Sequence, residues 1–177
     1  FTQWEERWQN CQHVNLLQSW QYGDAKQTVE IWKPYRFLIL DDDRYEIALM
    51  QILLKKIPVL GVIARINRGP LIIGEIDEQK QELIALNTIE ALIAESKKRK
   101  WRMLQIAPEL NCTDFIINYL KSLGLSELSA PAWESGLISL ALNEDELLMG
   151  LNGKWRNCLR KGWRSAISIN NLDVTTK

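Results

Sequence analysis

The segment Asp77–Lys100 constrains the fold of this 177-residue chain most strongly, because it carries the longest helical pattern in the sequence. Acidic residues lie near its start, a basic run (Lys97–Lys100) ends it, and apolar residues recur at helical spacing: Leu83, Leu86, Ile89, Leu92 and Ile93. Such a stripe buries one helix face against another layer of the protein. The basic run suits the negative end of the helix dipole, so we interpret it as structural.

Strand-like runs surround this helix. β-Branched and aromatic residues alternate in two runs that a turn at Asp41–Asp43 joins into a predicted hairpin, and similar runs precede and follow the helix. The predicted strands are Thr28–Leu40, Tyr45–Leu54, Val62–Ile66, the apolar run Leu71–Ile73, Trp101–Ala107, and further short strands near Ser126–Ala130, Trp133–Leu142 and Ile167–Val174. Pro34 predicts that the first of them is an edge strand or is interrupted.

Shorter helices are predicted between and beside these strands. They cover Thr2–Val14, a segment that starts at Trp20 after the cap Ser19, Thr113–Leu123 with Gly124 as its left-handed cap, and a segment that Asn143 caps. Helices mixed with strands in this order predict an α/β or α+β fold, with a mixed, largely antiparallel sheet flanked by helices.

The stretch Leu151–Arg164 is predicted to be an amphipathic helix with one basic face. Five cations share one arc of that helix, namely Lys154, Arg156, Arg160, Lys161 and Arg164. The opposite, packing face carries Trp155, Cys158, Leu159, Gly162 and Trp163. Two interpretations remain open: an ordinary surface helix whose polar face is basic, or a docking site for a polyanion such as a phosphate-bearing substrate or RNA.

Charge is distributed unevenly although the formal net charge is zero. Residues from Leu151 onward carry six Lys or Arg and one acid, which leaves 16 basic and 21 acidic residues in the first 150. The whole chain is therefore not a generic nucleic-acid binder, but its C-terminal segment is a candidate anion site. The three cysteines have no paired spacing, and no run of 18 apolar residues occurs. We expect a reduced, cytoplasmic setting, with the inner face of the membrane as a further possibility.

Several kinds of catalytic site are excluded by their missing motifs. The sequence has no dinucleotide-binding glycine pattern, no phosphate-binding loop, no zinc-protease motif and no nucleophile elbow. The acidic triplet Asp41–Asp43 is interpreted as a solvated hairpin tip rather than a metal site. His13 is the one histidine and is interpreted as structural. We therefore predict no metal, and we assign no catalytic residue.

Three blocks of the sequence, in this order, resemble the FemAB family. They are Leu16–Lys26 (LLQSWQYGDAK), Arg65–Pro70 (RINRGP) and Gly153–Lys161 (GKWRNCLRK). That family contains the aminoacyltransferases that build peptidoglycan bridges and belongs to the GNAT superfamily, whose fold is that of the N-acetyltransferases. The resemblance implies a GNAT-like fold. Residues 1–150 would be an N-terminal GNAT-like unit, and residues 151–177 would open a second, truncated one.

The resemblance further implies a function and partners. Family members transfer an amino acid from aminoacyl-tRNA to a cell-wall precursor, so the expected partners are a UDP-linked or lipid-linked muropeptide, aminoacyl-tRNA and a second GNAT-like unit. Family members bind the precursor's diphosphate with a lysine to which Lys26 corresponds. We expect substrate binding at Lys26, Arg68, Trp20 and Tyr22. For Lys26 and Arg68 a structural role stays open, Arg68 then pairing with an acid.

The chain also departs from related patterns. The glycine-rich loop with which ordinary acetyltransferases hold acetyl-CoA does not occur, since Arg68 stands where its first glycine belongs. We therefore expect no cofactor in this unit. Two alternatives are an N-acetyltransferase that uses acyl-CoA, and a non-catalytic module that binds RNA or another anion through the basic helix.

Overall fold

The computed structural model describes residues 2–128 and 141–165. The chain divides into two compact units, Phe1–Leu128 and Ser129–Lys177.

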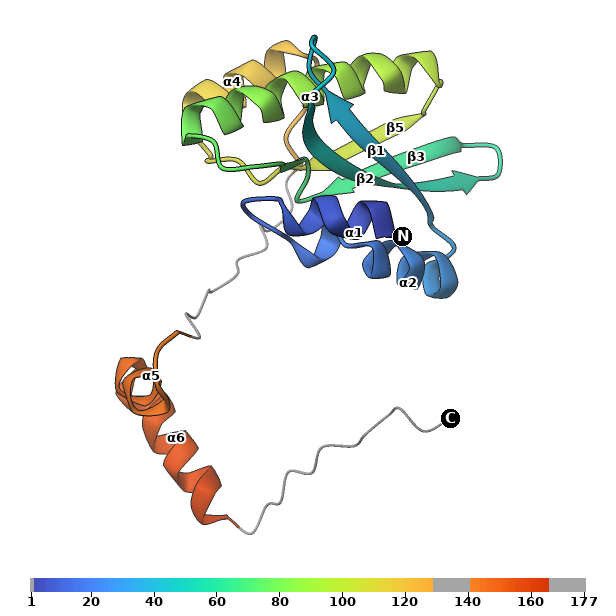
Figure 1. The fold of residues 1–177 in the computed structure, drawn as a ribbon. Helices are drawn as coiled ribbons and strands as arrows, with labels where there is room; N and C mark the ends of the chain where they lie inside the picture. Colours follow the sequence, from blue (N-terminus) through green and yellow to red (C-terminus); the bar gives the residue numbers. More distant parts are fainter. Residues whose placement is uncertain (1, 129–140, 166–177) are drawn as a thin grey trace. The chain divides into compact units, whose positions relative to one another are not determined.

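A mixed, largely antiparallel sheet forms the centre of the first unit (Figure 1). Its strands are β1 (Lys33–Leu40), β2 (Glu46–Ile57), β3 (Gly61–Asn67), β4 (Leu71–Ile72) and β5 (Met103–Ala107). The order is β1-β2-β3-β5, and β3 and β5 run parallel while the other pairs are antiparallel. β1 lies at the edge, which accommodates Pro34 as the sequence predicted.

Along one side of β2, two different strands pair with two separate segments and leave a gap between them. β3 pairs with residues 53–57 of β2, and β4 pairs with Ala48 and Leu49. Between β3 and β4 the chain leaves the sheet at Arg68-Gly69-Pro70, where the Gly69–Pro70 peptide bond is cis. The backbone of Gln51 therefore has no strand partner on this side, and other groups must satisfy it.

Helices cover both faces of the sheet. α3 (Glu78–Lys98) packs on one face, where Leu92 joins a core with Met50, Ile52, Ala64 and Ile66. Trp4 of α1 (Thr2–Gln9) packs with Cys11, Leu49 and Leu71 in a second cluster, on the other face. The short 3-10 turn η1 (Leu16–Gln18) and α2 (Trp20–Glu30) follow α1 and contact each other, and α2 also contacts β1. The predicted fold class is confirmed.

Side-chain caps fix where these helices begin. Ser19 accepts a hydrogen bond from the Tyr22 amide, Asp77 from the Lys80 amide, and Thr113 from the Ile116 amide at the start of α4 (Asp114–Ser122). Each cap satisfies an amide that has no partner within its helix. Gly124, after α4, has a φ of 86°, as the sequence predicted for a left-handed position.

The second unit contains two described helices, α5 (Glu144–Gly150) and α6 (Gly153–Arg164). Asn143 and Glu146 form a reciprocal capping box at the start of α5. α6 confirms the predicted amphipathic helix. The predicted strand near 167–174 lies outside the described residues, as do residues 133–140 and 129–130 of the other two predicted strands in this region. The described remainders of those two, residues 141–142 and 126–128, are not in strands. The division into GNAT-like units at residues 150 and 151 stays a prediction.

Two predicted elements have wrong bounds. The helix expected over Thr2–Val14 ends at Gln9. The strand expected over Thr28–Leu40 begins at Lys33, because α2 continues through Glu30. Thr28 donates its hydroxyl hydrogen to the Asp24 carbonyl one turn back, a bond that β-branched Thr makes readily within a helix. Ile31 then ends α2 with a φ of 61°. Local β-propensity at residues 28–31 was outweighed by the tertiary structure.

Candidate functional site

A buried polar network lies where α2 begins; we call Gln18, Gln51 and Arg36 the glutamine network. Gln18 occupies the break between β3 and β4. The side-chain Nε2 of Gln18 donates to the backbone carbonyl oxygens of Asn67 at 2.6 Å and Gln51 at 3.2 Å. Its side-chain Oε1 accepts from the backbone N–H of Gln51 at 2.7 Å. One side chain thus provides the hydrogen bonds that a strand residue would have made with β2.

The side chain of Gln51 extends the network towards α2. Its Nε2 donates to the Ser19 carbonyl at 2.9 Å, and its Oε1 accepts from Arg36 Nε at 2.9 Å. Arg36 Nη2 donates to the Trp20 carbonyl at 3.0 Å and to Asp24 at 2.9 Å. The Arg36 guanidinium also lies 3.5 Å from the centre of the Trp20 ring. The structure therefore places Trp20, a predicted substrate residue, in a contact that holds α2 to β1.

Two glycines leave space for this network. A Cβ atom on Gly23 would lie 2.3 Å from Gln51 Oε1 and 2.8 Å from Arg36 Nη2. A Cβ atom on Gly69 would lie 2.8 Å from the Gln18 amide carbon. The first two blocks quoted from the sequence, Leu16–Lys26 and Arg65–Pro70, thus meet at Gln18. Several residues of these two blocks, among them Gln18, Gly23 and Gly69, therefore have a role in stabilising the fold.

The second half of α2 adjoins a different group of side chains, which we call the Trp32 cluster: Lys26, Glu30, Trp32, Lys55 and Arg65. Trp32 is 7% exposed, and both Lys55 Nζ, at 5.4 Å, and Arg65 Cζ, at 5.0 Å, lie over its ring. Lys26 forms an ion pair with Glu30, and its ammonium lies 5.5 Å from the centre of the Tyr22 ring. Side chains from α2, β2 and β3 therefore converge at one place.

The charges of the Trp32 cluster interact with one another. The hydrogen bond from Lys26 lowers the pKa of Glu30, and the nearby charge of Lys55 lowers it further. The same hydrogen bond raises the pKa of Lys26, whereas the charge of Arg65 acts in the opposite direction. The cluster thus holds three cations and one carboxylate in a connected group.

Such a group can bind an anion. Two of its positive charges are not balanced within the cluster, and Arg65 donates a hydrogen bond from Nε to Gln105 Oε1 at 3.0 Å. A phosphate-bearing ligand would gain hydrogen bonds to ionised donors, which are the stronger kind. The charged ends of Lys55 and Arg65 both lie over the buried ring of Trp32, which limits the positions that they can take.

Arg68 belongs to a separate ion pair. Its Nη1 lies 3.7 Å from Glu109 Oε1, and its backbone amide donates to the Ala107 carbonyl at 2.7 Å. Arg68 itself has a φ of 53°, which places it in the left-handed region. The structural alternative for Arg68, pairing with an acid, is therefore the one seen in the structure. The predicted residue Tyr22 lies beside Lys26 and remains a candidate contact for a ligand.

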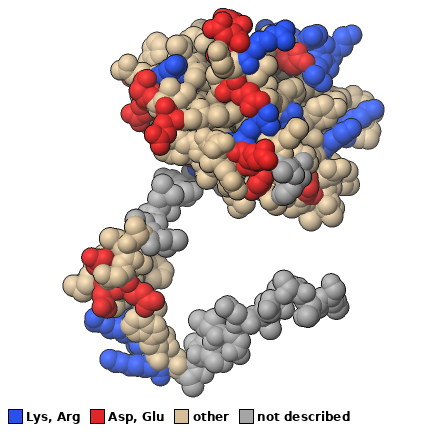
Figure 2. Space-filling view, in the orientation of Figure 1, with Lys and Arg blue, Asp and Glu red and all other residues tan. Residues whose placement is uncertain are grey.

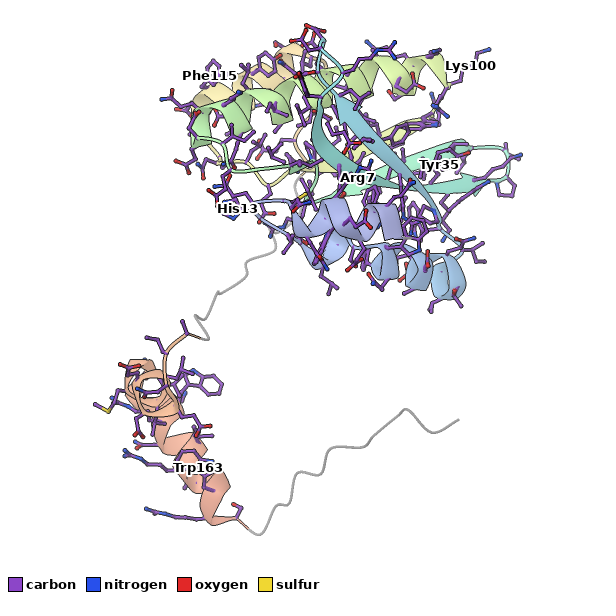
Figure 3. All side chains as sticks on the ribbon, in the orientation of Figure 1. Arg7, His13, Tyr35, Lys100, Phe115 and Trp163 are labelled. Carbon is purple, nitrogen blue, oxygen red and sulfur yellow. The ribbon has the colours of Figure 1, made fainter. Side chains whose placement is uncertain are left out.

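In α6 the predicted apolar face carries an exposed hollow. It is lined by Leu151, Trp155, Cys158, Leu159 and Gly162. Trp155 and Trp163 are both about two-thirds exposed, and Figure 3 labels Trp163 on this helix. Arg156 donates to the sulfur of Met149 at 3.5 Å. Polyanion binding by Lys154, Arg156, Arg160, Lys161 and Arg164 stays a prediction.

Other candidate groups take no part in these clusters. His13 is exposed in the loop after α1 (Figure 3). Burial raises the pKa of the Cys11 thiol to about 11, so this thiol stays protonated at neutral pH. In the described ranges, no three His, Cys, Asp or Glu residues are placed to hold a metal ion. None of the described helices is long and apolar enough to span a membrane.

Sequence reasoning missed Trp32, Lys55 and Arg65 as members of one site. They come from three segments, and the strand register of β2 and β3 brings them together, with Leu53 opposite Arg65. The one available signal was Lys55, a cation that follows an otherwise apolar strand.

Comparisons with known proteins give structural matches. No protein-family model matches the chain, and no curated protein matches it. A solved structure described as a "probable acetyltransferase" matches 67% of this chain and 76% of its own, with 12% identity and a TM-score of 0.42. Glucosamine-6-phosphate N-acetyltransferase from Arabidopsis thaliana matches 65% of this chain and 74% of its own, with 12% identity and a TM-score of 0.40.

Ribosomal-protein-alanine N-acetyltransferase from Brucella melitensis biovar Abortus matches 60% of this chain and 71% of its own, with 16% identity and a TM-score of 0.35. The likeness to these proteins lies in the path of the chain.

Proposed function

We propose that this chain is the substrate-binding unit of a FemAB-like acyl- or aminoacyltransferase that acts on a phosphate-bearing peptidoglycan precursor. The observation that carries the proposal is the Trp32 cluster, in which Lys26 lies with Lys55 and Arg65 on one surface. The sequence resemblance points to Lys26 as a diphosphate ligand, and the structure adds two cations beside it.

The expected role of the cluster is positioning. A diphosphate carries two negative charges close together, and clustered ammonium and guanidinium groups recognise such a group by charge and by hydrogen bonds. Holding the diphosphate would place the amine of the precursor relative to an acyl donor bound elsewhere. Positioning of this kind lowers the entropic part of the reaction barrier.

The acyl donor is proposed to be aminoacyl-tRNA rather than acyl-CoA. The N-terminus of α3, the longest helix of the unit, is capped by the Asp77 carboxylate and followed by Glu78. A helix N-terminus attracts phosphates through free amides and a positive dipole end, and these two acids oppose the binding of a CoA diphosphate at this helix. The choice of aminoacyl-tRNA as the donor itself follows from the resemblance to the FemAB family. Titration of the full-length protein with acetyl-CoA separates the two donors, because tight binding would favour the acyl-CoA alternative.

Binding of a UDP-linked muropeptide to the full-length protein tests the proposed substrate. In isothermal titration, Lys26→Ala and Arg65→Ala should each weaken binding by about tenfold or more, because each removes a charge-assisted hydrogen bond. Lys80→Ala, an exposed lysine near the start of α3, is the matched control and should leave the dissociation constant unchanged. Equal affinities for all three variants and the wild type would remove the Trp32 cluster from the substrate site.

A further inference from the structure

Charge is segregated along the strands of the first unit. β1 begins where β2 ends, since Lys33 pairs with Leu54, and β3 begins there too, since Ile57 pairs with Gly61. β5 is parallel to β3 and starts at the same end, directly after α3 finishes. Three junctions of the chain, at residues 31–33, 57–61 and 98–103, therefore lie at one end of the sheet.

Exposed cations cover this end. We call it the basic end and define it by Lys33, Lys56, Lys97, Lys98, Lys100 and Arg102, all of which are exposed. Figure 2 shows Lys and Arg atoms gathered at the upper right of this unit, where Lys100 is labelled in Figure 3. Two nearby carboxylates are already engaged, Glu95 with Arg99 and with Lys98 at 3.9 Å, and Glu30 with Lys26. The surplus of positive charge is therefore local and strong.

Aliphatic side chains project from the same end. The β2–β3 turn carries Val59 and Leu60, which are 106% and 62% exposed, and Ile31 at the end of α2 is 82% exposed. Val59 and Ile31 have φ angles of 68° and 61°, in the left-handed region that β-branched residues avoid. The backbone thus presents apolar groups to solvent between the cations.

The opposite end of the sheet has the reverse character. The β1–β2 turn carries Asp41, Asp42 and Asp43, and the chain between β4 and α3 carries Glu75 and Asp77. Positive and negative charge are therefore separated along the strand direction, with one acidic end and one basic end. This separation would orient the unit at a charged surface.

We infer that the basic end binds the surface of an anionic lipid bilayer. Lysine and arginine side chains would contact lipid phosphates, and Val59 and Leu60 would enter the boundary between headgroups and acyl chains. RNA would also be attracted by the cations. However, the exposed residues of the turn are aliphatic, whereas single-stranded nucleic acid is bound with aromatic side chains on which bases stack. The combination favours lipid.

Co-sedimentation of the full chain with vesicles tests this inference. The protein is expected to bind vesicles of equimolar phosphatidylcholine and phosphatidylglycerol, to bind pure phosphatidylcholine vesicles far less, and to dissociate as salt is raised. Lys56→Gln combined with Lys100→Gln should weaken binding about tenfold or more, since each cation near an anionic surface contributes about fivefold. Arg44→Gln combined with Lys80→Gln removes the same charge near the acidic end and should change binding less than about twofold.

A third variant separates lipid from RNA. Val59→Asn removes the exposed apolar group and suits the left-handed backbone, so the protein should fold at least as well as the wild type. It should weaken vesicle binding severalfold and leave binding of a polyuridine RNA unchanged. Vesicle binding that is indifferent to all the basic-end variants, and is lost when Arg160 and Lys161 of α6 are changed to Gln, would overturn the inference. RNA binding in preference to vesicles that is weakened by Lys56→Gln combined with Lys100→Gln would overturn it as well.

Discussion

An arginine lies on a tryptophan at each end of α2, and the two contacts serve different purposes. At the start of α2, Arg36 of β1 stacks on Trp20 at 3.5 Å and reaches three acceptors, among them the 1%-exposed Gln51. Just beyond the end of α2, Arg65 of β3 lies 5.0 Å from the Trp32 ring and donates a hydrogen bond to Gln105. An arginine on a tryptophan is thus part of the folded framework at one place and a candidate ligand-binding group at the other. Burial and the number of satisfied hydrogen bonds distinguish the two.

The largest expected effect comes from removing the centre of the glutamine network. Gln18→Ala leaves the Gln51 amide and the Asn67 carbonyl without their partner, so the free energy of unfolding should fall by about 2–5 kcal/mol. Chemical denaturation measures this change. Gln27→Ala, an exposed glutamine on α2, is the control and should change stability by less than about 0.5 kcal/mol. A Gln18→Ala protein as stable as this control would contradict the structural role.

The matched arginines should respond differently to the same substitution. Arg36→Lys keeps the charge but loses the fork of donors that reaches three acceptors, so we expect a loss of about 1–3 kcal/mol in the free energy of unfolding. Arg65→Lys should change stability by less than about 0.5 kcal/mol, because Arg65 is exposed. Equal losses at both positions would remove the distinction between the arginine–tryptophan contacts at the two ends of α2.

The smallest expected effect is the pH dependence of the Lys26–Glu30 pair. Because the pKa of Glu30 is lowered in the folded protein, its contribution to stability is present above its unfolded pKa and is lost as pH falls through the folded value. Because the pKa of Lys26 is raised, its contribution is lost as pH rises through the folded value, above 10.5.

Thermal unfolding of the wild type and of Glu30→Gln should therefore differ most near neutral pH and converge at both extremes. The exposure of the pair keeps the difference small. A difference that grows in acid would contradict this account.

Local signals in the sequence predicted much of the fold. The predicted caps Ser19 and Asn143 lie where their side chains satisfy free helix amides, and the stripe of α3 packs on the sheet as its spacing predicted. Such features depend on residues a few positions apart. The start of β1 was misplaced because Thr28 and Val29 favour strands locally but complete α2 in the folded chain.

The candidate site was less predictable for a physical reason. Lys26 was identified from a resemblance, but Lys55 and Arg65 reach it through strand register and the long-range packing of Trp32. Gln18 was likewise unremarkable in sequence, because its role depends on a break in a strand pair some 50 residues away. Neither the strand register that gathers the Trp32 cluster nor the break in pairing that Gln18 fills produces a periodic pattern in the sequence.

The affinity of Glu30→Gln for a UDP-linked muropeptide tests the central claim most directly. Glu30 competes with a bound phosphate for Lys26, so removing its charge should strengthen binding severalfold, while Lys26→Ala weakens it. A merely structural ion pair would not move the dissociation constant in opposite directions on the loss of its two partners. If Glu30→Gln leaves the affinity unchanged or weakens it, the Trp32 cluster is not the anion site of this protein.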